Sequence, residues 1–290
     1  MREKTNLTIR EACVSDRQSL ANIIHFEVYV HRHLDWRQPL DWINCNPFFI
    51  ASSENKILAA IACPPDPAHI AWIRLLAISS DLHINNAWLE LWRKVKEYFN
   101  GEDEVIIAAI PRQGWFQKLL EEGGFKLTNH VVMMLWESKE LPAEHQVPGL
   151  KIRPMNFDDL PSIEVLDTIT FDPVWRISES SLIHAYRQAA IATVAEMDNT
   201  IIGYQISTTS HHGGHLARLA IHPKYRRMGN GYNLVHDILV RFNKRGVFNI
   251  SVNTQMDNKN SLALYEKLGF KITNEIFPTY QYFMSSHQQT

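Results

Sequence analysis

Cysteine is scarce in this sequence, and the three that occur, Cys13, Cys45 and Cys63, form no Cys-x-x-Cys pair. An odd number without that spacing predicts neither a disulfide framework nor a zinc site, and it suits reduced thiols in the cytoplasm. Charge of one sign is equally scarce, since the formal net charge is only -2. Bulk charge therefore gives no support to nucleic acid or a membrane surface as a partner.

Long apolar runs are absent as well. No stretch approaches the roughly 18 consecutive apolar residues that a membrane-spanning helix needs. The charged start, MREKTNLTIREA, has no apolar run behind it. We therefore expect neither a membrane span nor a signal peptide, and we expect a cytoplasmic monomer or homodimer.

What the sequence does contain is an internal repeat. LTIREACVSD at 7–16 resembles LKIRPMNFDD at 150–159, and LLEEGGFKLTN at 119–129 resembles LYEKLGFKITN at 264–274. The offsets are 143 and 145 residues, and the second pair shares seven of its eleven positions. A repeat of this length indicates a duplicated domain rather than a solenoid unit.

The duplication sets the expected domain boundary. A chain of 290 residues is long for one hydrophobic core and comfortable for two. Between the copies lies the polar segment ELPAEHQVPG at 140–149, which holds two prolines and suits a linker. We therefore divide the chain into domains 1–146 and 147–290.

Strand-like and helix-like stretches alternate in both copies. In the second copy, 192–198 and 200–210 form an expected hairpin across Asp198-Asn199, since both residues tolerate turn geometry. A later strand ends before Pro223, a helix follows from about Tyr232, and a further strand completes a βαβ crossover. Early hairpins with a late crossover predict a mixed α/β layout.

The most specific feature of the second copy is YRRMGNGYNLVHD at 225–237, which puts two arginines and two glycines before an amphipathic helix. The strand before this loop and the helix after it leave unpaired amide N–H groups where the strand ends. Gly229 and Gly231 let the backbone approach a phosphate because they have no Cβ, and Arg226 and Arg227 add positive charge. The pattern predicts a site for a pyrophosphate.

The loop spacing is neither that of a Walker P-loop nor the GxGxxG of dinucleotide folds. Arg226-x-x-Gly229-x-Gly231 resembles instead the [RQ]xxGx[GA] acetyl-CoA loop of the GCN5-related N-acetyltransferase (GNAT) family. Downstream, NKNSLALYEKLGF at 258–270 is similar to the second motif of that family, Nxx[AS]xxLYxKxGF. With both motifs in order, the chain resembles a tandem two-domain member of the family.

The resemblance implies an α/β (mixed α+β) fold of two tandem GNAT-like domains, each a mostly antiparallel mixed sheet flanked by helices, with a splayed parallel strand pair. The splayed strands map to 216–221 and 250–254, and acetyl-CoA is the implied co-substrate. Its pyrophosphate would lie on the loop backbone and its pantetheine arm between the strands. The implied cofactor-binding residues are Leu219, Ile221, Arg226, Arg227, Met228, Gly229, Asn230, Gly231 and Asn258.

The resemblance also implies catalytic residues. Tyr265 would lie near the thioester sulfur and protonate the departing thiolate of coenzyme A. Relatives carry a glutamate base six residues before the position of Ile221 or five before the motif asparagine, and this sequence has His215 and Asn253 there. His215 is the candidate base, because an unperturbed imidazole with a pKa of about 6.5 is largely neutral at pH 7.

Simpler interpretations exist for the same residues. Tyr265 also suits the packed end of an amphipathic helix, and His215 suits an ordinary strand. HHGGH at 211–215 suits a polar turn rather than a metal site, because no carboxylate or cysteine joins it at ligand spacing. TFDPVWR at 170–176 lies where relatives shape the acceptor groove, and core packing explains it equally well.

The first copy has lost both glycines of the loop. At the offset of 143, the positions of the arginine and the two glycines hold His83, Asn86 and Trp88. A tryptophan at that point would block a phosphate sterically. We therefore expect 1–146 to be a degenerate GNAT-like domain without the acetyl-CoA loop, and 147–290 to hold the functional site.

Two classes of function follow. The first is an acetyl-CoA-dependent N-acetyltransferase that acts on a primary amine of a small molecule or of a protein, at its N-terminus or at a lysine, without a metal and without nucleic acid or membrane as partner. The alternative is a non-catalytic acyl-CoA-binding sensor or scaffold, which the missing glutamates and the decayed first copy favour.

Overall fold

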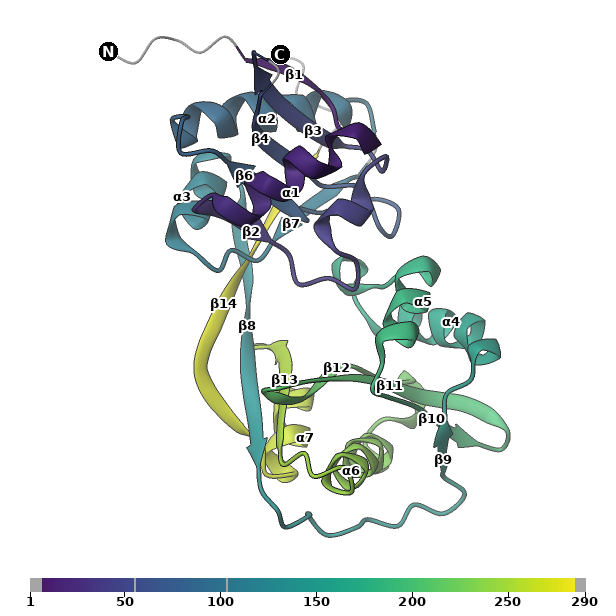
Figure 1. The fold of residues 1–290 in the computed structure, drawn as a ribbon. Helices are drawn as coiled ribbons and strands as arrows, with labels where there is room; N and C mark the ends of the chain where they lie inside the picture. The colour runs from purple at the N-terminus through teal and green to yellow at the C-terminus, as the bar shows by residue number, and fades with distance from the viewer. Residues whose placement is uncertain (1–6, 55, 103, 285–290) are drawn as a thin grey trace. The chain divides into compact units, whose positions relative to one another are not determined.

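The computed structural model describes residues 7–54, 56–102 and 104–284, and the charged start at residues 1–6 lies outside them. The chain divides into two compact units (Figure 1). Unit 1 runs to Thr128 and includes the segment from Pro278 onward, and unit 2 is Asn129–Phe277. These units differ from the expected boundary at 146/147, which follows the repeat in the sequence.

The difference arises because the last strand of each repeat belongs to the unit of the other repeat. Strand β8 (Lys126–Glu137) comes from the first repeat, yet its residues 131–137 pair with β13 (Asn249–Gln255) of unit 2. Strand β14 (Lys271–Phe283) comes from the second repeat, yet its residues 280–283 pair with β7 (Ile106–Ala109) of unit 1. Each core is thus completed by a strand from the other half of the sequence.

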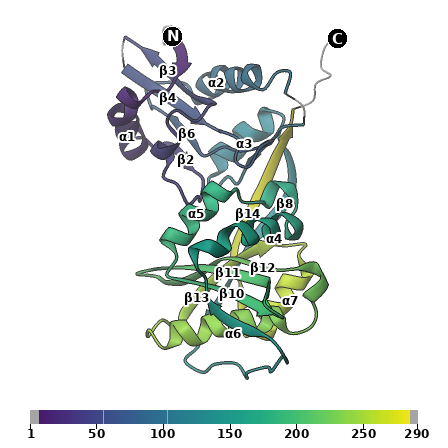
Figure 2. The same cartoon turned by 90° about the vertical axis from the view of Figure 1, so that its right-hand side faces the viewer.

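Unit 1 is a sheet between two layers of helices. Helix α1 (Arg17–Phe26) covers one face, and α2 (Ile84–Tyr98) and α3 (Gly114–Glu122) cover the other (Figure 2). A short strand, β5 (Ile70–Trp72), pairs in parallel with β7. The main sheet has the order β1-β3-β4-β6-β2, with β1 at Thr8–Glu11, β3 at Phe48–Ser53, β4 at Lys56–Ala62, β6 at Leu75–Ile78 and β2 at Tyr29–Arg32, and 3-10 turns lie at Val14–Asp16 and Pro39–Trp42.

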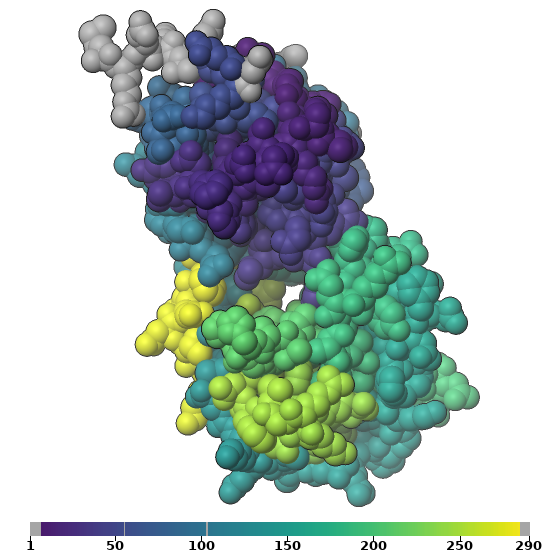
Figure 3. Space-filling model, in the orientation of Figure 1, coloured from purple at the N-terminus to yellow at the C-terminus, as the bar shows by residue number. Residues whose placement is uncertain are grey.

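Unit 2 repeats this layering. Helices α4 (Leu160–Thr170) and α5 (Glu179–Gln188) cover one face of its sheet, and α6 (Asn230–Asn243) and α7 (Lys259–Lys267) cover the other (Figure 1). The outer side chains of α6 form the lime-green surface of that second face (Figure 3). The strand order is β9-β10-β11-β12-β13-β8, with β9 at Lys151–Pro154, β10 at Ile191–Met197, β11 at Thr200–Ser210 and β12 at Gly213–Ile221, and 3-10 turns lie at Phe157–Asp159, Pro173–Trp175 and Pro223–Tyr225.

Local sequence explains several of these elements. The expected hairpin is confirmed: β10 and β11 meet at Asp198 and Asn199, whose φ angles of 50° and 59° are those of a tight hairpin turn. The duplication is visible in single contacts as well. Arg10 binds Asp16 at 2.7 Å, and the residues 143 positions later, Arg153 and Asp159, form the same ion pair at 2.7 Å.

Within the described residues, no helix combines the length and the apolar character needed to cross a bilayer.

The strand exchange gives a testable prediction for Tyr280 of β14, which is 3% exposed in the unit 1 core and whose hydroxyl donates to Glu121. Tyr280→Ala should destabilise unit 1 by about 3 kcal/mol, the usual effect of truncating a buried aromatic side chain. Hydrogen exchange should then speed up in β4 and β7 of unit 1 and stay slow in β10 of unit 2. Phe283→Ala is the matched control, because Phe283 lies in the same strand and is 54% exposed. Equal acceleration in both units, or none, would contradict the assignment.

Candidate functional site

The central feature of unit 2 is a parallel strand pair that comes apart. Strands β12 and β13 pair from Gly214 with Ile250 to Leu216 with Val252, and the pairing ends there although both strands continue. The cause lies on the other side of β12, where Ile206 and Ser207 of β11 pair with Arg218 and Leu216. Ala217 is therefore an extra residue, a β-bulge, which bends and twists β12 away from its neighbour.

The expected splayed pair is thus confirmed, and it places two of the predicted cofactor residues. Leu219 and Ile221 lie on the part of β12 that has left β13. Among the described residues, their only strand partners are Gln205 and Gly203 of β11. The opening can hold an extended polar chain, which would pair with the free edge of β12 as a strand does.

The loop after β12 forms a cradle of backbone amides. Its chain makes a 3-10 turn, then takes left-handed conformations at Arg227 (φ 65°) and Gly229 (φ 86°), and α6 begins at Asn230. Among the described residues, no acceptor binds the backbone N–H groups of residues 227–232. Six free donors at the positive end of a helix dipole can bind a phosphate or pyrophosphate.

The side chains of this loop hold its shape rather than extend from it. Arg226 donates through Nε to the carbonyl of Ile221 at 3.0 Å, and its Nη2 lies 3.4 Å from the carbonyl of Thr170. Arg227 donates to Asn260 Oδ1 at 2.6 Å. Both guanidinium groups are thus engaged with the protein while their charge stays beside the amides.

Three further loop residues have distinct surroundings. Met228 is 55% exposed. Asn230 is buried and donates through Nδ2 to the carbonyl of Tyr225 at 2.8 Å, which braces the start of α6. A Cβ at Gly231 would lie 3.3 Å from Leu264 Cδ2, so this glycine allows α6 and α7 to pack closely.

The segment 140–149 lies along α6. Tyr232 donates its hydroxyl to the carbonyl of Ala143 at 2.8 Å, and His236 Nε2 lies 3.0 Å from the carbonyl of Pro142. This places His145 directly on the loop, since a Cβ at Gly229 would lie 2.7 Å from its Cδ2. The linker is therefore part of the surroundings of the amide cradle, which the sequence did not reveal.

The second motif forms helix α7 and the turn that leads from it into β14. Asn258 caps α7, because its Oδ1 accepts from the backbone N–H of Ser261 at 3.1 Å. Tyr265 is 4% exposed and its ring contacts Phe270. Among the described residues no partner binds its hydroxyl, and burial raises its pKa above the usual value. The phenol thus stays protonated and keeps a free donor.

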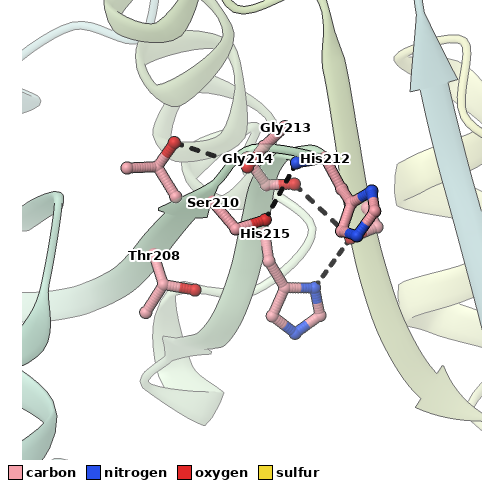
Figure 4. A pocket seen from close by; sticks show the side chains of 8 residues that line it. Thr208, Ser210, His212, Gly213, Gly214 and His215 are labelled. Carbon is pink, nitrogen blue, oxygen red and sulfur yellow. Dashed lines mark hydrogen bonds between the residues drawn. The ribbon is translucent and has the colours of Figure 1, made fainter.

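His215 lies where β12 and β13 are still paired. Its Nδ1 is 2.9 Å from Oγ of Ser251, its partner across the strands, and its other ring nitrogen points away from that bond (Figure 4). In the tautomer with the proton on Nδ1, the Ser251 oxygen accepts from Nδ1–H while its hydroxyl donates to the carbonyl of Gly214 at 3.4 Å. This arrangement leaves the lone pair of Nε2 free to take a proton.

The side of the sheet on which His215 lies follows from strand alternation. Leu216, Ile250 and Val252 pack in the core beneath α6 and α7. Successive side chains of a strand point to opposite faces, so His215 and Ser251 point to the face that α4 and α5 cover. There they border a pocket at the β11–β12 turn, lined by Thr208, Thr209, Ser210, His212, Gly213, Gly214, His215 and Ser251 (Figure 4).

The histidines next to this turn have different surroundings. The rings of His211 and His212 contact each other with centroids 3.8 Å apart, while His215 binds Ser251. In the part of the chain that the structure describes, no three His, Cys, Asp or Glu side chains gather closely enough to hold a metal ion.

A buried polar network on the α4/α5 face was missed by sequence reasoning. Asp167 of α4 is fully buried and accepts from the hydroxyl of Tyr204 at 2.5 Å and from Nε of Arg218 at 2.6 Å. Burial raises the pKa of the Tyr204 phenol, so it remains a donor. The signal in the sequence of α4, LPSIEVLDTIT, was an aspartate four residues after Ile163, on the helix face that is otherwise apolar.

The corresponding edge in unit 1 is closed. Ala71 pairs with Ile107 as Gly214 pairs with Ile250, so both units begin with the same parallel register at an offset of 143. Beyond this point, however, β6 pairs with β2 along Leu75–Ile78. A strand of the protein itself therefore fills the place that stays open in unit 2.

The expected steric role of Trp88 is wrong. Its side chain is fully buried between the sheet and α3, stacked on Trp92 and in contact with Phe116. Helix α2 also starts at Ile84, three positions earlier in the repeat than α6 does. The amide cradle is missing from unit 1 because the helix absorbs those residues, and Trp88 does not reach into the place of a phosphate.

Comparison with known proteins agrees with this geometry. Residues 160–270 match the Acetyltransferase (GNAT) family. A stretch of 67 residues is 37% identical to human N-alpha-acetyltransferase 30, and it spans 23% of this chain and only 18% of that protein.

Two solved structures share the fold over nearly the whole chain. A tandem GNAT protein from the clavulanic acid biosynthesis pathway superposes with a TM-score of 0.65 at 13% identity, covering 96% of this chain and 99% of that one. A GCN5-related N-acetyltransferase from Sphaerobacter thermophilus gives a TM-score of 0.64 at 12% identity, covering 96% of both chains. The predicted tandem architecture is therefore confirmed.

The surroundings of His215 give a prediction that needs no ligand. Burial lowers the pKa of this imidazole below its usual value of 6.5, because the charged form loses hydration. Titration of the ring C–H resonances by NMR should place its midpoint below pH 6.5, with the resonance identified by its loss in His215→Ala. A midpoint at or above 6.5 would contradict the described burial.

Proposed function

We propose that this chain, of which residues 160–270 match the Acetyltransferase (GNAT) family, transfers an acetyl group from acetyl-CoA to a primary amine. The observation that carries the proposal is the row of free amides at residues 227–232, placed directly after the strand that leaves its neighbour. A pyrophosphate on the amides and a pantetheine arm in the opening would bring the thioester between β12 and β13.

The residues present fit such a ligand. The loop amides would bind the pyrophosphate, since no acceptor among the described residues binds them. Leu219 and Ile221 would bind the arm through their backbones, and Asn258 would reach it through Nδ2, since its Oδ1 caps α7. Acetyl-CoA supplies a thioester carbonyl that an amine can attack.

His215 and Tyr265 would move protons in opposite directions. The free Nε2 of His215 would take a proton from the amine, directly or through a water molecule, so that a neutral nitrogen attacks the carbonyl. As the C–N bond forms, the C–S bond breaks and Tyr265 would donate its proton to the departing thiolate. The attacking nitrogen would lose its second proton, which returns to the phenolate through water. Since burial keeps the phenol protonated, the acid is ready before each turnover.

The amine would approach from the α4/α5 face. The opposite face is filled by the core under α6, with Val235, Leu239 and Phe242 fully buried. His215 and Ser251 are half-buried and polar, and they lie on the α4/α5 side. Similarity to N-alpha-acetyltransferase 30 favours an α-amino terminus as acceptor over a lysine or a small amine.

A non-catalytic acyl-CoA sensor is the second candidate. It is favoured by the absence of a carboxylate at the positions of His215 and Asn253, where relatives carry a glutamate base. Release of free coenzyme A in the presence of amines separates the two functions, because a sensor binds acetyl-CoA without turnover.

The closed edge of unit 1 predicts one coenzyme site per chain. Calorimetric titration with acetyl-CoA should give a stoichiometry of one, because β2 already occupies the edge of β6. Gly229→Ala should weaken this single site, since its φ of 86° disfavours a side chain and the new Cβ would meet His145. A stoichiometry of two would show that unit 1 binds the coenzyme as well.

The proposed catalytic pair, His215 and Tyr265, gives a kinetic prediction. His215→Ala should lower turnover by roughly 10²–10⁴-fold, the usual range for one acid–base group, with acetyl-CoA affinity unchanged. Tyr265→Phe keeps the ring packing and should lower turnover without loss of stability. Because burial lowers the pKa of His215, the rate should rise with pH through a midpoint below 6.5, and this limb should vanish in His215→Ala.

His211→Ala is the matched control, because His211 is exposed and close in sequence but does not border the pocket. The acceptor amine has its own ionisation, so every profile must use the same acceptor. If turnover and the pH limb survive in His215→Ala, the histidine is a structural strand residue and another group is the base.

A further inference from the structure

The buried Asp167–Tyr204–Arg218 network holds more than its own members together. Arg218 Nη2 donates to the carbonyl of Trp175 at 2.8 Å, and its guanidinium lies 4.1 Å from the ring centre of Phe171. The second oxygen of Asp167 accepts from the backbone N–H of Ile177 at 3.1 Å. The network thus fixes the turn between α4 and α5, residues 171–177, onto β12.

The internal repeat shows that the fold does not need this network. The strand registers place Tyr204 and Arg218 where unit 1 has Ala60 and Leu75, because Tyr204 pairs with Ala220 as Ala60 pairs with Ala77, and Arg218 pairs with Ile206 as Leu75 pairs with Ala62. The offset of 143 places Asp167 at Ile24. Ile24, Ala60 and Leu75 all belong to one buried hydrophobic cluster between α1 and the sheet.

Physical chemistry makes the comparison informative. A buried ion pair is costly to desolvate, and aliphatic residues in its place are often neutral or stabilising. Unit 1 uses that solution at the same place in the same fold. The buried polar residues of unit 2 are therefore explained by the turn that they hold in place, residues 171–177.

The positioned turn borders the approach to the splayed strands. Arg218 follows the Ala217 bulge and lies on the same face of β12 as His215, three residues away, which is about 10 Å along a strand. Phe171 and Trp175, on this turn, are half-buried.

We propose that Asp167, Tyr204 and Arg218 are positioning residues that set the acceptor-binding wall formed by residues 171–177. This inference rests on the proposed acetyl transfer. The network acts on the amine acceptor and not on the coenzyme, because it is anchored on the α4/α5 face and the amide cradle lies at the start of α6.

Tyr204→Phe is the sharpest test, since this phenol is fully buried and cannot touch an acceptor. The acceptor is the best substrate of the wild type from a panel of free-amine peptides and small primary amines. Removing one buried hydrogen bond should raise its KM by about threefold to tenfold, with the acetyl-CoA Kd and the pH profile unchanged.

The double variant Asp167→Ile with Arg218→Leu copies the unit 1 residues and removes both charges together. It should fold with a Tm within about 5 °C of the wild type and raise the acceptor KM by at least about tenfold. Arg153→Gln is the matched control, because Arg153 binds Asp159 at 2.7 Å and Glu196 at 2.6 Å in the same unit, away from residues 171–177. It should leave the acceptor KM within about twofold of the wild type.

An unchanged acceptor KM in both network variants, with wild-type turnover intact, would overturn this inference alone. A rise in the acetyl-CoA Kd equal to the rise in KM would also overturn it, because the network would then act through the coenzyme. A wild type that binds acetyl-CoA and turns over no amine of the panel would overturn the proposed function first, and this inference with it.

Discussion

The functional half of this protein depends on one extra residue in a strand. Ala217 has no place in the β11–β12 register, and the bulge it forms separates β12 from β13 after only three parallel pairs. The bulge leaves a free backbone edge between two strands that are both buried in the sheet, where such an edge is otherwise paired. The part of β12 beyond the bulge leads into the loop whose amides bind no acceptor among the described residues, so the proposed coenzyme site depends on this single local irregularity.

An open edge has to be held open by its surroundings. On one side, the core under α6 fixes β13 through Ile250 and Val252, and β8 pairs along the whole of β13. On the other side, Arg218 ties β12 to Asp167 of α4, and Arg226 ties the loop to the carbonyls of Ile221 and Thr170. The two arginines therefore hold β12 and the loop in place, as hydrogen bonds between paired strands do elsewhere in the sheet. The arginine side chains fix the backbone, while the loop amides would bind the anion.

Local rules in the sequence predicted much of this and could not predict the rest. The hairpin at Asp198-Asn199, the glycines of the loop and the two motifs all act within a few residues, so their spacing alone was informative. The partner of His215 was out of reach, because Ser251 becomes its neighbour only through the parallel register, 36 positions away. The position of His145 on Gly229 was equally hidden, since a polar linker carries no periodic signal. The exchange of β8 and β14 escaped because each strand continues the pattern of its own repeat.

The contrast between the two units comes from one connection of nearly equal length. Between the first helix and the next sheet strand, residues 27–47 of unit 1 contain β2, and residues 171–190 of unit 2 contain α5. The sequence explains each outcome: EVYVHR at 27–32 alternates β-branched and polar residues, while Ser178 caps the helical segment that follows it by accepting from Ser181. A strand in this position pairs with the edge of β6 and closes it, and a helix covers the face and leaves the edge of β12 open. The proposed site in unit 2 therefore depends on this connection as much as on its glycines, because restoring the loop glycines in unit 1 would still leave β2 paired with the edge of β6.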